Sequence, residues 1–429
     1  MEKEAKKRNV ENHTGTLKKI VDSKISPADY AQLKLKPLSS LDAVETLEEL
    51  RYDTQRIVIA QAAHTFGINS TGGDLFNFEA GGKYVMSVKT YSEVNHIRRG
   101  GKKVRMLKPT KPLFCNIYKP YTGQNLEGKT LLVERPGGIG DLCFIQPNLI
   151  HLKTKYPTCH IAFACRSQYH DMLKTWGCID ELIALPFSFK YLLNSDYHAV
   201  FEGVLERCAE AKMVNAYELF SEWLGLRLPI EELRPTQEAL SEYVEKVEGF
   251  LKQWNLEKGS FVVLQTRASS PIRTMSLELT KKLIKALLDE GYKVVITDSV
   301  HGADLIDSAL KDFPDKPVYN FARHSTSIGG AIALISLSKG VVSCDSAAIH
   351  LGVSLDVPVF GIYGAFPGHT RMSTYGPTVD WIDCEAACAP CFKHGYATGC
   401  PETWTSSIHA KCLDNLDISA AMIKIKALM

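Results

Sequence analysis

From residue 130 onward, short apolar runs alternate with segments of helical periodicity. The apolar runs predict strands at 130–134, 160–164, 181–185, 198–201, 261–265, 293–297, 341–344 and 357–362. The periodicity between them predicts helices, among them 141–155, 276–290 and 345–355. Alternating strands and helices are typical of parallel sheets covered by helices. We therefore predict an α/β protein built from doubly wound, Rossmann-like domains.

Other segments suggest how these units are connected. Residues 231–259 are charged, have helical spacing and lack strands, so they would link an α/β unit that ends near 230 to one that begins near 260. Residues 417–429 predict an amphipathic helix with Asp417 as its N-cap. Residues 41–64 have broadly helical apolar spacing, whereas Lys83 to Val94 alternates like a strand.

These segments predict three regions. Residues 1–120 form an additional N-terminal α+β region, 121–245 a first Rossmann-like domain, and 246–429 a second one that includes a C-terminal cysteine cluster and helix. Between Arg98 and Lys111, seven of fourteen residues are Lys or Arg, interrupted by two glycines. This run predicts a basic hairpin or loop, which could be a solvated surface, a grip for an anionic acceptor, or an assembly surface.

Composition excludes several classes of protein. The 429 residues are 45% hydrophobic and 23% charged with a net charge of +2, so nothing in the overall charge favours nucleic acid or membrane. The first residues are too charged for a signal peptide, and no apolar run is long enough to span a membrane. We expect a cytoplasmic protein, and the sequence leaves open whether it forms an oligomer.

A glycine-rich turn, Pro136 to Asp141, joins the predicted strand at 130–134 to the following helix. Gly137, Gly138 and Gly140 would let a ligand approach the backbone closely. Glycines alone would suggest a phosphate cradle, but Asp141 closes the turn. A carboxylate at this place favours a site that handles a hydroxyl group or a proton.

A second motif lies in the last third of the chain. Asp345-Ser346-Ala347-Ala348-Ile349-His350-Leu351 follows a strand and precedes Val357-Pro358-Val359-Phe360-Gly361-Ile362-Tyr363-Gly364. Together with the Gly-Gly-Ile-Gly-Asp turn, this resembles the bacterial heptosyltransferases, glycosyltransferase family 9. The resemblance covers roughly residues 121–429.

The resemblance implies the GT-B arrangement, in which two Rossmann-like domains face each other across a cleft. The first domain would hold the acceptor and the second the nucleotide-sugar donor. The implied reaction is inverting transfer of a sugar, heptose or a related one, from an ADP-sugar to a hydroxyl group. No metal or other cofactor is implied for catalysis.

The resemblance also implies roles for single residues. Asp141 matches the turn aspartate of the family and would be the catalytic base, whereas its sequence context alone is more typical of a helix N-cap. Ser346 and Ala347 open the helix after 341–344, so their backbone N–H groups could bind the diphosphate. Asp345 is expected to cap that helix, and His350 could either contact the donor or be a packed residue.

A second contact with the diphosphate is expected from the loop after 261–265. Thr266, Ser269 and Arg273 lie in this loop, and Arg273 stands where the family carries a lysine. Asp298, after the strand 293–297, is a weaker candidate for the donor's ribose hydroxyls.

Five of the twelve cysteines lie between residues 384 and 412. Cys388, Cys391, Cys400 and Cys412 could hold a structural zinc or iron ion, because Cys-x-x-Cys is a metal-ligand spacing. The alternatives are packed thiols or partial disulfides. Any such metal would lie away from the chemistry.

Three functions compete at this point. A glycosyltransferase acting on a glycolipid, a protein or a nucleic acid is the leading one. A degenerate transferase fold used for binding or assembly is the second. An NAD-dependent oxidoreductase is the third, but the turn lacks the Gly-x-Gly-x-x-Gly spacing and the acidic residue about 20 positions on.

Overall fold

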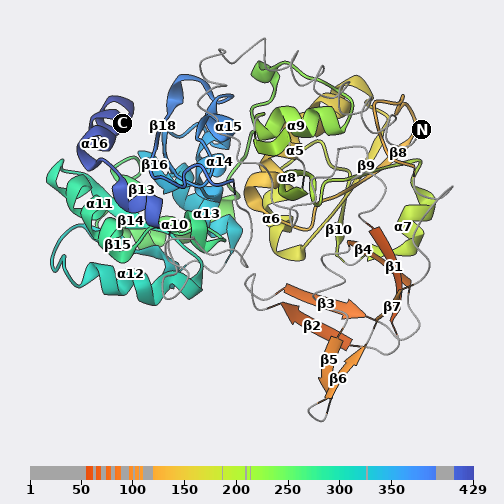
Figure 1. The fold of residues 1–429 in the computed structure, drawn as a ribbon, viewed down its shortest axis with the longest axis horizontal. Coiled ribbons are helices and arrows are strands. Elements are labelled where there is room, and N and C mark those ends of the chain that lie inside the picture. The colour runs from red at the N-terminus through yellow and green to blue at the C-terminus, as the bar shows by residue number, and fades with distance from the viewer. Residues whose placement is uncertain are drawn as a thin grey trace. The chain divides into compact units, whose positions relative to one another are not determined.

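The structure is a computed structural model that describes most of the chain from residue 119 on. It describes 119–185, 187–207, 210–212, 214–324, 327–392 and 410–429, and also the backbone of seven strands between 55 and 109. All of them belong to one compact unit, Thr46–Met429. Figure 1 shows the elements named below.

The later part of the chain forms a six-stranded sheet in which every strand is parallel. Its strands are β13 (Phe261–Gln265), β14 (Lys293–Ile296), β15 (Val318–Asn320), β16 (Gly340–Cys344), β17 (Val359–Tyr363) and β18 (Val379–Asp383). Their order in the sheet is β15-β14-β13-β16-β17-β18. From β13 the chain adds β14 and β15 on one side. It then returns to add β16, β17 and β18 on the other side, which is the Rossmann order.

Successive residues of these strands point to opposite faces of the sheet, and most of them are apolar. Helices therefore cover both faces. On one face Val262 and Leu264 pack with helices α11 (Leu277–Asp289), α12 (Ala303–Leu310) and α16 (Ile418–Leu428). On the other, Gly352 of α14 (Ala347–Ser354) lies against Val341 and Val359. α14 also contacts α13 (Ile328–Ser336), which packs on α10 (Ser241–Gln253).

The preceding part of the chain forms a four-stranded parallel sheet. Its order is β10 (Glu181–Ala184), β9 (His160–Cys165), β8 (Thr130–Glu134) and β12 (Tyr197–Val200). The helix after β8, α5 (Ile139–Lys155), packs on α9 (Ala216–Trp223) through Phe144, Tyr217 and Phe220. Two parallel sheets with intervening helices confirm the predicted α/β class and are consistent with two domains.

The sequence located most of these strands but missed two. β15 and β18 lie at the two edges of the six-stranded sheet, where the strands are short or half-buried and so lack the long apolar runs of the centre. Residues 55–60 form β1 (Gln55–Ala60), so the helix predicted over 41–64 is wrong there. The boundary predicted at 245/246 falls within α10, and the domain limits stay predictions.

The N-terminal strands pair in antiparallel fashion. β1 lies between β4 (Lys83–Ser87) and β7 (Leu107–Pro109), and β4 also pairs with β11 (Phe187–Ser188). β2 (His64–Ile68) pairs with β3 (Asp74–Phe78). β5 (His96–Arg99) pairs with β6 (Lys102–Arg105), so the predicted basic hairpin is confirmed, although its side chains lie outside the description. The expected helical part of this region, residues 41–54, also lies outside it.

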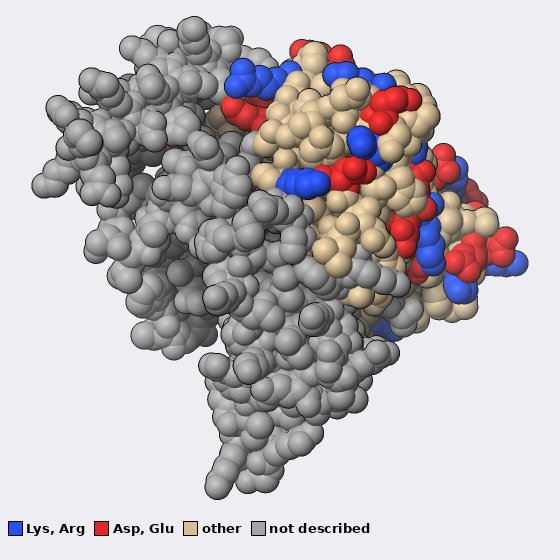
Figure 2. Space-filling view, turned by 90° about the vertical axis from the view of Figure 1, so that its right-hand side faces the viewer, with Lys and Arg blue, Asp and Glu red and all other residues tan. Residues whose placement is uncertain are grey.

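One face of the molecule is of mixed charge where it is described (Figure 2). On the face in Figure 2, Lys and Arg side chains are interspersed with Asp and Glu, with no continuous patch of one sign on the described part. Over the same residues, no helix combines the length and apolarity that crossing a bilayer requires.

Candidate functional site

The glycine turn after β8 needs glycine for two reasons. Gly138 has φ +91°, a backbone conformation that side chains disfavour, and a Cβ atom there would lie 2.1 Å from Oδ2 of Asp141. A Cβ at Gly137 would lie 2.7 Å from the ring of Tyr169. The turn is thus tightly folded, and the carboxylate of Asp141 lies back over the backbone of Gly138.

Asp141 is held by Arg135 and does not cap the helix. α5 begins at Ile139 with Gly138 in the cap position, and no side chain caps it, so the N-cap alternative for Asp141 is wrong. Nη2 of Arg135 forms an ion pair with Oδ2 of Asp141. The side chain of Asp141 is 21% exposed and that of Arg135 only 5%, so the carboxylate is the more accessible partner.

Arg135 ties together the two loops at the centre of the first sheet. Its Nε donates to the carbonyl of Gly137 at 2.9 Å and its Nη1 to the carbonyl of Phe201 at 2.9 Å. The first loop follows β8 and the second follows β12, the two strands at which the strand order reverses. Ligands of such sheets bind at this reversal, beyond the carboxyl ends of the strands.

The turn after β16 is organised by Ser346. Its Oγ accepts from the backbone N–H of Ala348 at 3.3 Å and lies 2.8 Å from Oγ of Ser343, so Ser346 is the N-cap of α14. The cap predicted at Asp345 is therefore one residue too early. Asp345 instead is buried and contacts Arg273.

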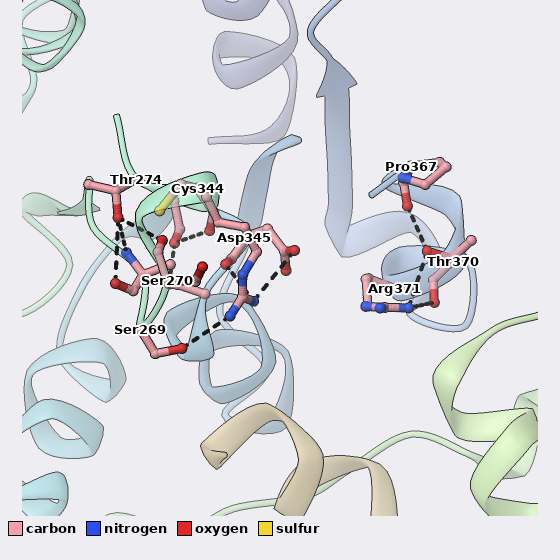
Figure 3. A network of polar contacts seen from close by, with 12 residues as sticks. Ser269, Ser270, Thr274, Cys344, Asp345, Pro367, Thr370 and Arg371 are labelled. Atoms are coloured by element: carbon pink, nitrogen blue, oxygen red, sulfur yellow. Dashed lines mark hydrogen bonds and ion pairs between the residues drawn. The ribbon is translucent and has the colours of Figure 1, made fainter. Parts of the chain in front are cut away.

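Arg273 joins the loop after β13 to the turn after β16 (Figure 3). Its Nη1 donates to the carbonyl of Asp345 at 3.2 Å and lies 3.5 Å from that residue's carboxylate, while Nη2 donates to Oγ of Ser269 at 3.1 Å. Burial acts to lower the pKa of Arg273, but Asp345 and, more weakly, Asp141 outweigh it, and the pKa is raised. Arg273 thus stays charged within electrostatic reach of Asp141.

Two further predicted donor residues lie at the same edge of the second sheet. Thr266 is buried directly after β13, and its carbonyl accepts from the N–H of Met275 at 2.9 Å. Asp298 follows β14 and lies 3.4 Å from Nη1 of Arg267, and burial raises the pKa of its carboxyl. The fold therefore brings Thr266, Ser269, Arg273, Asp298, Asp345, Ser346 and Ala347 to the carboxyl ends of β13, β14 and β16.

His350 is a packed residue that connects the two sheets. Its Nδ1 lies 2.5 Å from the hydroxyl of Tyr375, which lies 2.6 Å from the hydroxyl of Tyr217 in α9. Its ring also stands edge-on to Phe144, and a Cβ added to Gly140 would lie 2.7 Å from it. Burial lowers the pKa of His350 to about 3, so the imidazole is neutral.

Sequence reasoning missed several residues that organise this region. Arg135 stands directly before the glycine turn, so its position next to the motif could have revealed it. Tyr217, Tyr375 and Arg371 carried no such signal, because each lies outside the motifs and is brought near them only by the fold.

The cysteine cluster is described only in part. Cys384 and Cys412 are buried, Cys388 and Cys391 are half-buried, and Cys400 lies outside the described residues. Within the described part, no three His, Cys, Asp or Glu side chains are grouped so as to hold a metal. The set predicted from the sequence therefore cannot be assembled from the described residues, and the metal stays a prediction.

A pocket lined by Leu251, Asn255 and Leu337 lies elsewhere. It is formed by the end of α10 and the residues just before β13 and β16, at the amino ends of these strands. It contains none of the residues considered above, so the chemistry is not expected there.

Comparison with known proteins agrees with the motifs. The sequence model of glycosyltransferase family 9 (heptosyltransferase) matches residues 207–400. Lipopolysaccharide heptosyltransferase 3 of Escherichia coli (strain K12) is 29% identical over 110 residues, which are 25% of this chain. The match spans about a third, 32%, of that relative's length.

Two solved structures share the fold. ADP-heptose lps heptosyltransferase II of E. coli superimposes with a TM-score of 0.55 at 16% identity, over 70% of this chain and 98% of that one. A glycosyl transferase family 9 protein of Veillonella parvula DSM 2008 gives 0.50 at 15% identity, over 61% and 87%. The chain is heptosyltransferase-like, as its motifs predicted, and has the fold of these GT-B proteins.

Proposed function

We propose that this heptosyltransferase-like protein is an inverting glycosyltransferase. It would transfer a sugar from a nucleotide-diphosphate donor, an ADP-heptose or a related ADP-sugar, to a hydroxyl group of an acceptor. The observation that carries the proposal is the composition of the two turns. The turn after β8 presents a partly exposed carboxylate, Asp141, and the turn after β16 presents a helix N-terminus. Arg273, from the loop after β13, contacts this second turn and lies within electrostatic reach of Asp141.

The second sheet supplies what a departing diphosphate needs. Negative charge builds up on the diphosphate as the bond from the sugar's anomeric carbon to oxygen breaks. Arg273 and the first N–H groups of α14 lie at the reversal between β13 and β16, where such an anion is bound in this type of sheet. These groups would stabilise the leaving group without a metal ion.

The first sheet supplies the base. As the acceptor oxygen forms its bond to the anomeric carbon from the opposite side, its proton would pass to the carboxylate of Asp141. Arg135 stabilises the ionised carboxylate, which is the form that accepts a proton. The glycines at 137, 138 and 140 let this turn pack closely against Tyr169, Asp141 and His350, which fixes the carboxylate in place.

The only observation that bears on the chemical class of the acceptor is the charge on one described face of the molecule (Figure 2). On the described part of the face in Figure 2, Lys and Arg are interspersed with Asp and Glu, and this face does not favour a nucleic acid backbone. A sugar hydroxyl of a glycolipid or a side-chain hydroxyl of a protein fits the proposed chemistry equally. A binding or assembly protein on the same fold is the alternative, and it would not need Asp141.

A panel of nucleotide sugars tests the proposal. Purified protein is melted in the presence of ADP-, UDP-, GDP- and CMP-sugars. A ligand at 100 times its dissociation constant adds about 2.7 kcal/mol of apparent stability, which raises the melting temperature measurably. We expect the ADP-sugars to give the largest shift. A panel in which no nucleotide sugar changes the melting temperature would contradict the proposed donor site.

A further inference from the structure

Arg371 is a buried cation near the candidate donor site. It lies in the short helix α15 (His369–Met372), which follows β17, and only 4% of it is exposed. Its Nη1 donates to the carbonyl and to the hydroxyl of Thr370, both at 3.2 Å, and its guanidinium lies over the ring of Phe366 with its central carbon 4.8 Å from the ring centre.

No carboxylate among the described residues lies within 4.0 Å of this guanidinium, the distance that defines an ion pair. The other arginines of the region do have acidic partners: Arg135 pairs with Asp141, and Arg273 with Asp345. Taking a guanidinium out of water without a counter-ion is costly. The described part of the site thus carries one buried positive charge that no protein carboxylate at ion-pair distance balances.

This charge is electrostatically coupled to residues of the candidate donor site. Asp345, Arg273 and Asp141 all lie within electrostatic reach of Arg371, and burial lowers its pKa. β16 and β17 are parallel neighbours, so the residues after them lie at the same edge of the sheet. Figure 3 shows Asp345 with its contacts in one group and Arg371 with Thr370 and Pro367 in a neighbouring one.

Tyr363, the last residue of β17, gives a second and independent observation. Its hydroxyl is buried, and it has no hydrogen-bond partner among the described residues. Asp345 and Arg371 are among the charged groups that act on it. An unpaired buried hydroxyl and a buried cation without an ion-pair partner, which act on each other electrostatically, are groups that an anion with several oxygens would satisfy.

We propose that Arg371 binds the diphosphate of the nucleotide donor from the β17 side, opposite the contacts made by Arg273. This inference rests on the proposed donor site. A diphosphate carries at least two negative charges, whereas the charge of Arg273 is already shared with Asp345. Arg371 supplies the further positive charge, and its planar group can donate two parallel hydrogen bonds to phosphate oxygens.

Calorimetry with inorganic pyrophosphate and with ADP tests this role. We expect Arg371→Gln to bind both ligands ~10–100-fold more weakly, because a hydrogen bond between two charged groups is lost. Arg371→Lys keeps the charge without the planar group and should lie between the two. The matched control is Arg323→Gln, since Arg323 is exposed and paired with Asp304 and Asp307.

Melting of the ligand-free variants separates binding from structural support. If Arg371 awaits an anion, Arg371→Gln should melt at or above the wild-type temperature, since an unbalanced buried charge is removed. A lower melting temperature with unchanged affinity for both ligands would overturn the inference. Arg371→Met keeps the packing on Phe366, and it must show the same loss of affinity if the Gln variant does not fold.

Sugar-transfer assays test the proposed reaction separately from the anion site. Wild-type protein that binds pyrophosphate through Arg371 but transfers no sugar would refute the proposed reaction and leave the anion site standing. Wild-type protein that binds neither pyrophosphate nor ADP would refute the anion site itself.

Discussion

At the scale of single residues, Asp141 stands out because it forms an ion pair with Arg135 and does not cap helix α5. The sequence predicted the glycine turn and its carboxylate, because turn glycines and a following polar residue form a local pattern. It could not predict the ion pair with Arg135, since that pair depends on how the turn folds back over Gly138. For the same reason the cap of α14 was placed at Asp345, one residue before Ser346.

The role of Asp141 can be tested by Asp141→Asn. The change keeps the size of the side chain and removes the group that accepts a proton. We expect transfer to fall by ~10²–10⁴-fold, the usual contribution of a general base, with ADP-sugar affinity nearly unchanged. Turnover and calorimetric affinity are measured on the same preparation. Transfer close to that of the wild type would remove Asp141 from the mechanism.

At the scale of elements, the strands buried on both faces were predictable and the edge strands were not. β13 and β16 are mostly apolar and almost fully buried because helices cover both of their faces. β18 is only half-buried, and its pattern does not stand out from its neighbours. β1 was predicted as a helix for a different reason. Its apolar residues also fit helical spacing, and only its pairing with β4 and β7 shows that it is a strand.

The first turn of α14 gives a prediction at this scale. Ser346→Ala removes the cap, which costs about 1 kcal/mol of the free energy of unfolding. Because the N–H groups of this turn are proposed to bind the diphosphate, ADP affinity should fall as well. Chemical denaturation and calorimetry measure the two effects.

Asp417→Ala is the matched control for this variant. Asp417 caps α16 by accepting from the N–H of Ala420 at 3.0 Å, and it contacts none of the candidate donor residues. It should lose similar stability and keep its ADP affinity. Equal affinity in both variants would show that the α14 terminus does not bind the nucleotide.

At the scale of the whole molecule, the two parallel sheets could be predicted and their connection could not. Strand–helix alternation gave the class of fold, since each unit follows from its local pattern. The chain of Tyr217, Tyr375 and His350 joins residues that are far apart in the sequence and have no pattern in common. Of the three, only His350 lay in a motif, and its partner could not be inferred from it.

This buried histidine predicts how stability depends on pH. In the unfolded chain the imidazole has its ordinary pKa of 6.5, whereas burial lowers it to about 3 in the folded protein. Between these values the unfolded state binds more protons, so the free energy of unfolding falls as the pH drops below 6.5. The contribution of His350 approaches about 1.4 kcal/mol per pH unit. His198, with a lowered pKa of about 4, acts in the same direction.

Denaturation between pH 7 and pH 4 measures this effect. His350→Gln should be less stable at pH 7, because packing and a hydrogen bond are altered, but its stability should fall less steeply with acid. The control is His301→Gln, since His301 is exposed. Parallel curves for wild type and His350→Gln would show that another group is responsible for the acid sensitivity.

The contact between Gly140 and His350 has a consequence for how the sequence can vary. A methyl group at 140 would intrude on the ring of His350 in α14, so the space allowed to the turn after β8 is set by a residue far later in the chain. The two positions are therefore a complementary steric pair. A larger residue at 140 becomes acceptable only together with a smaller one at 350, and homologous sequences should vary at these positions jointly.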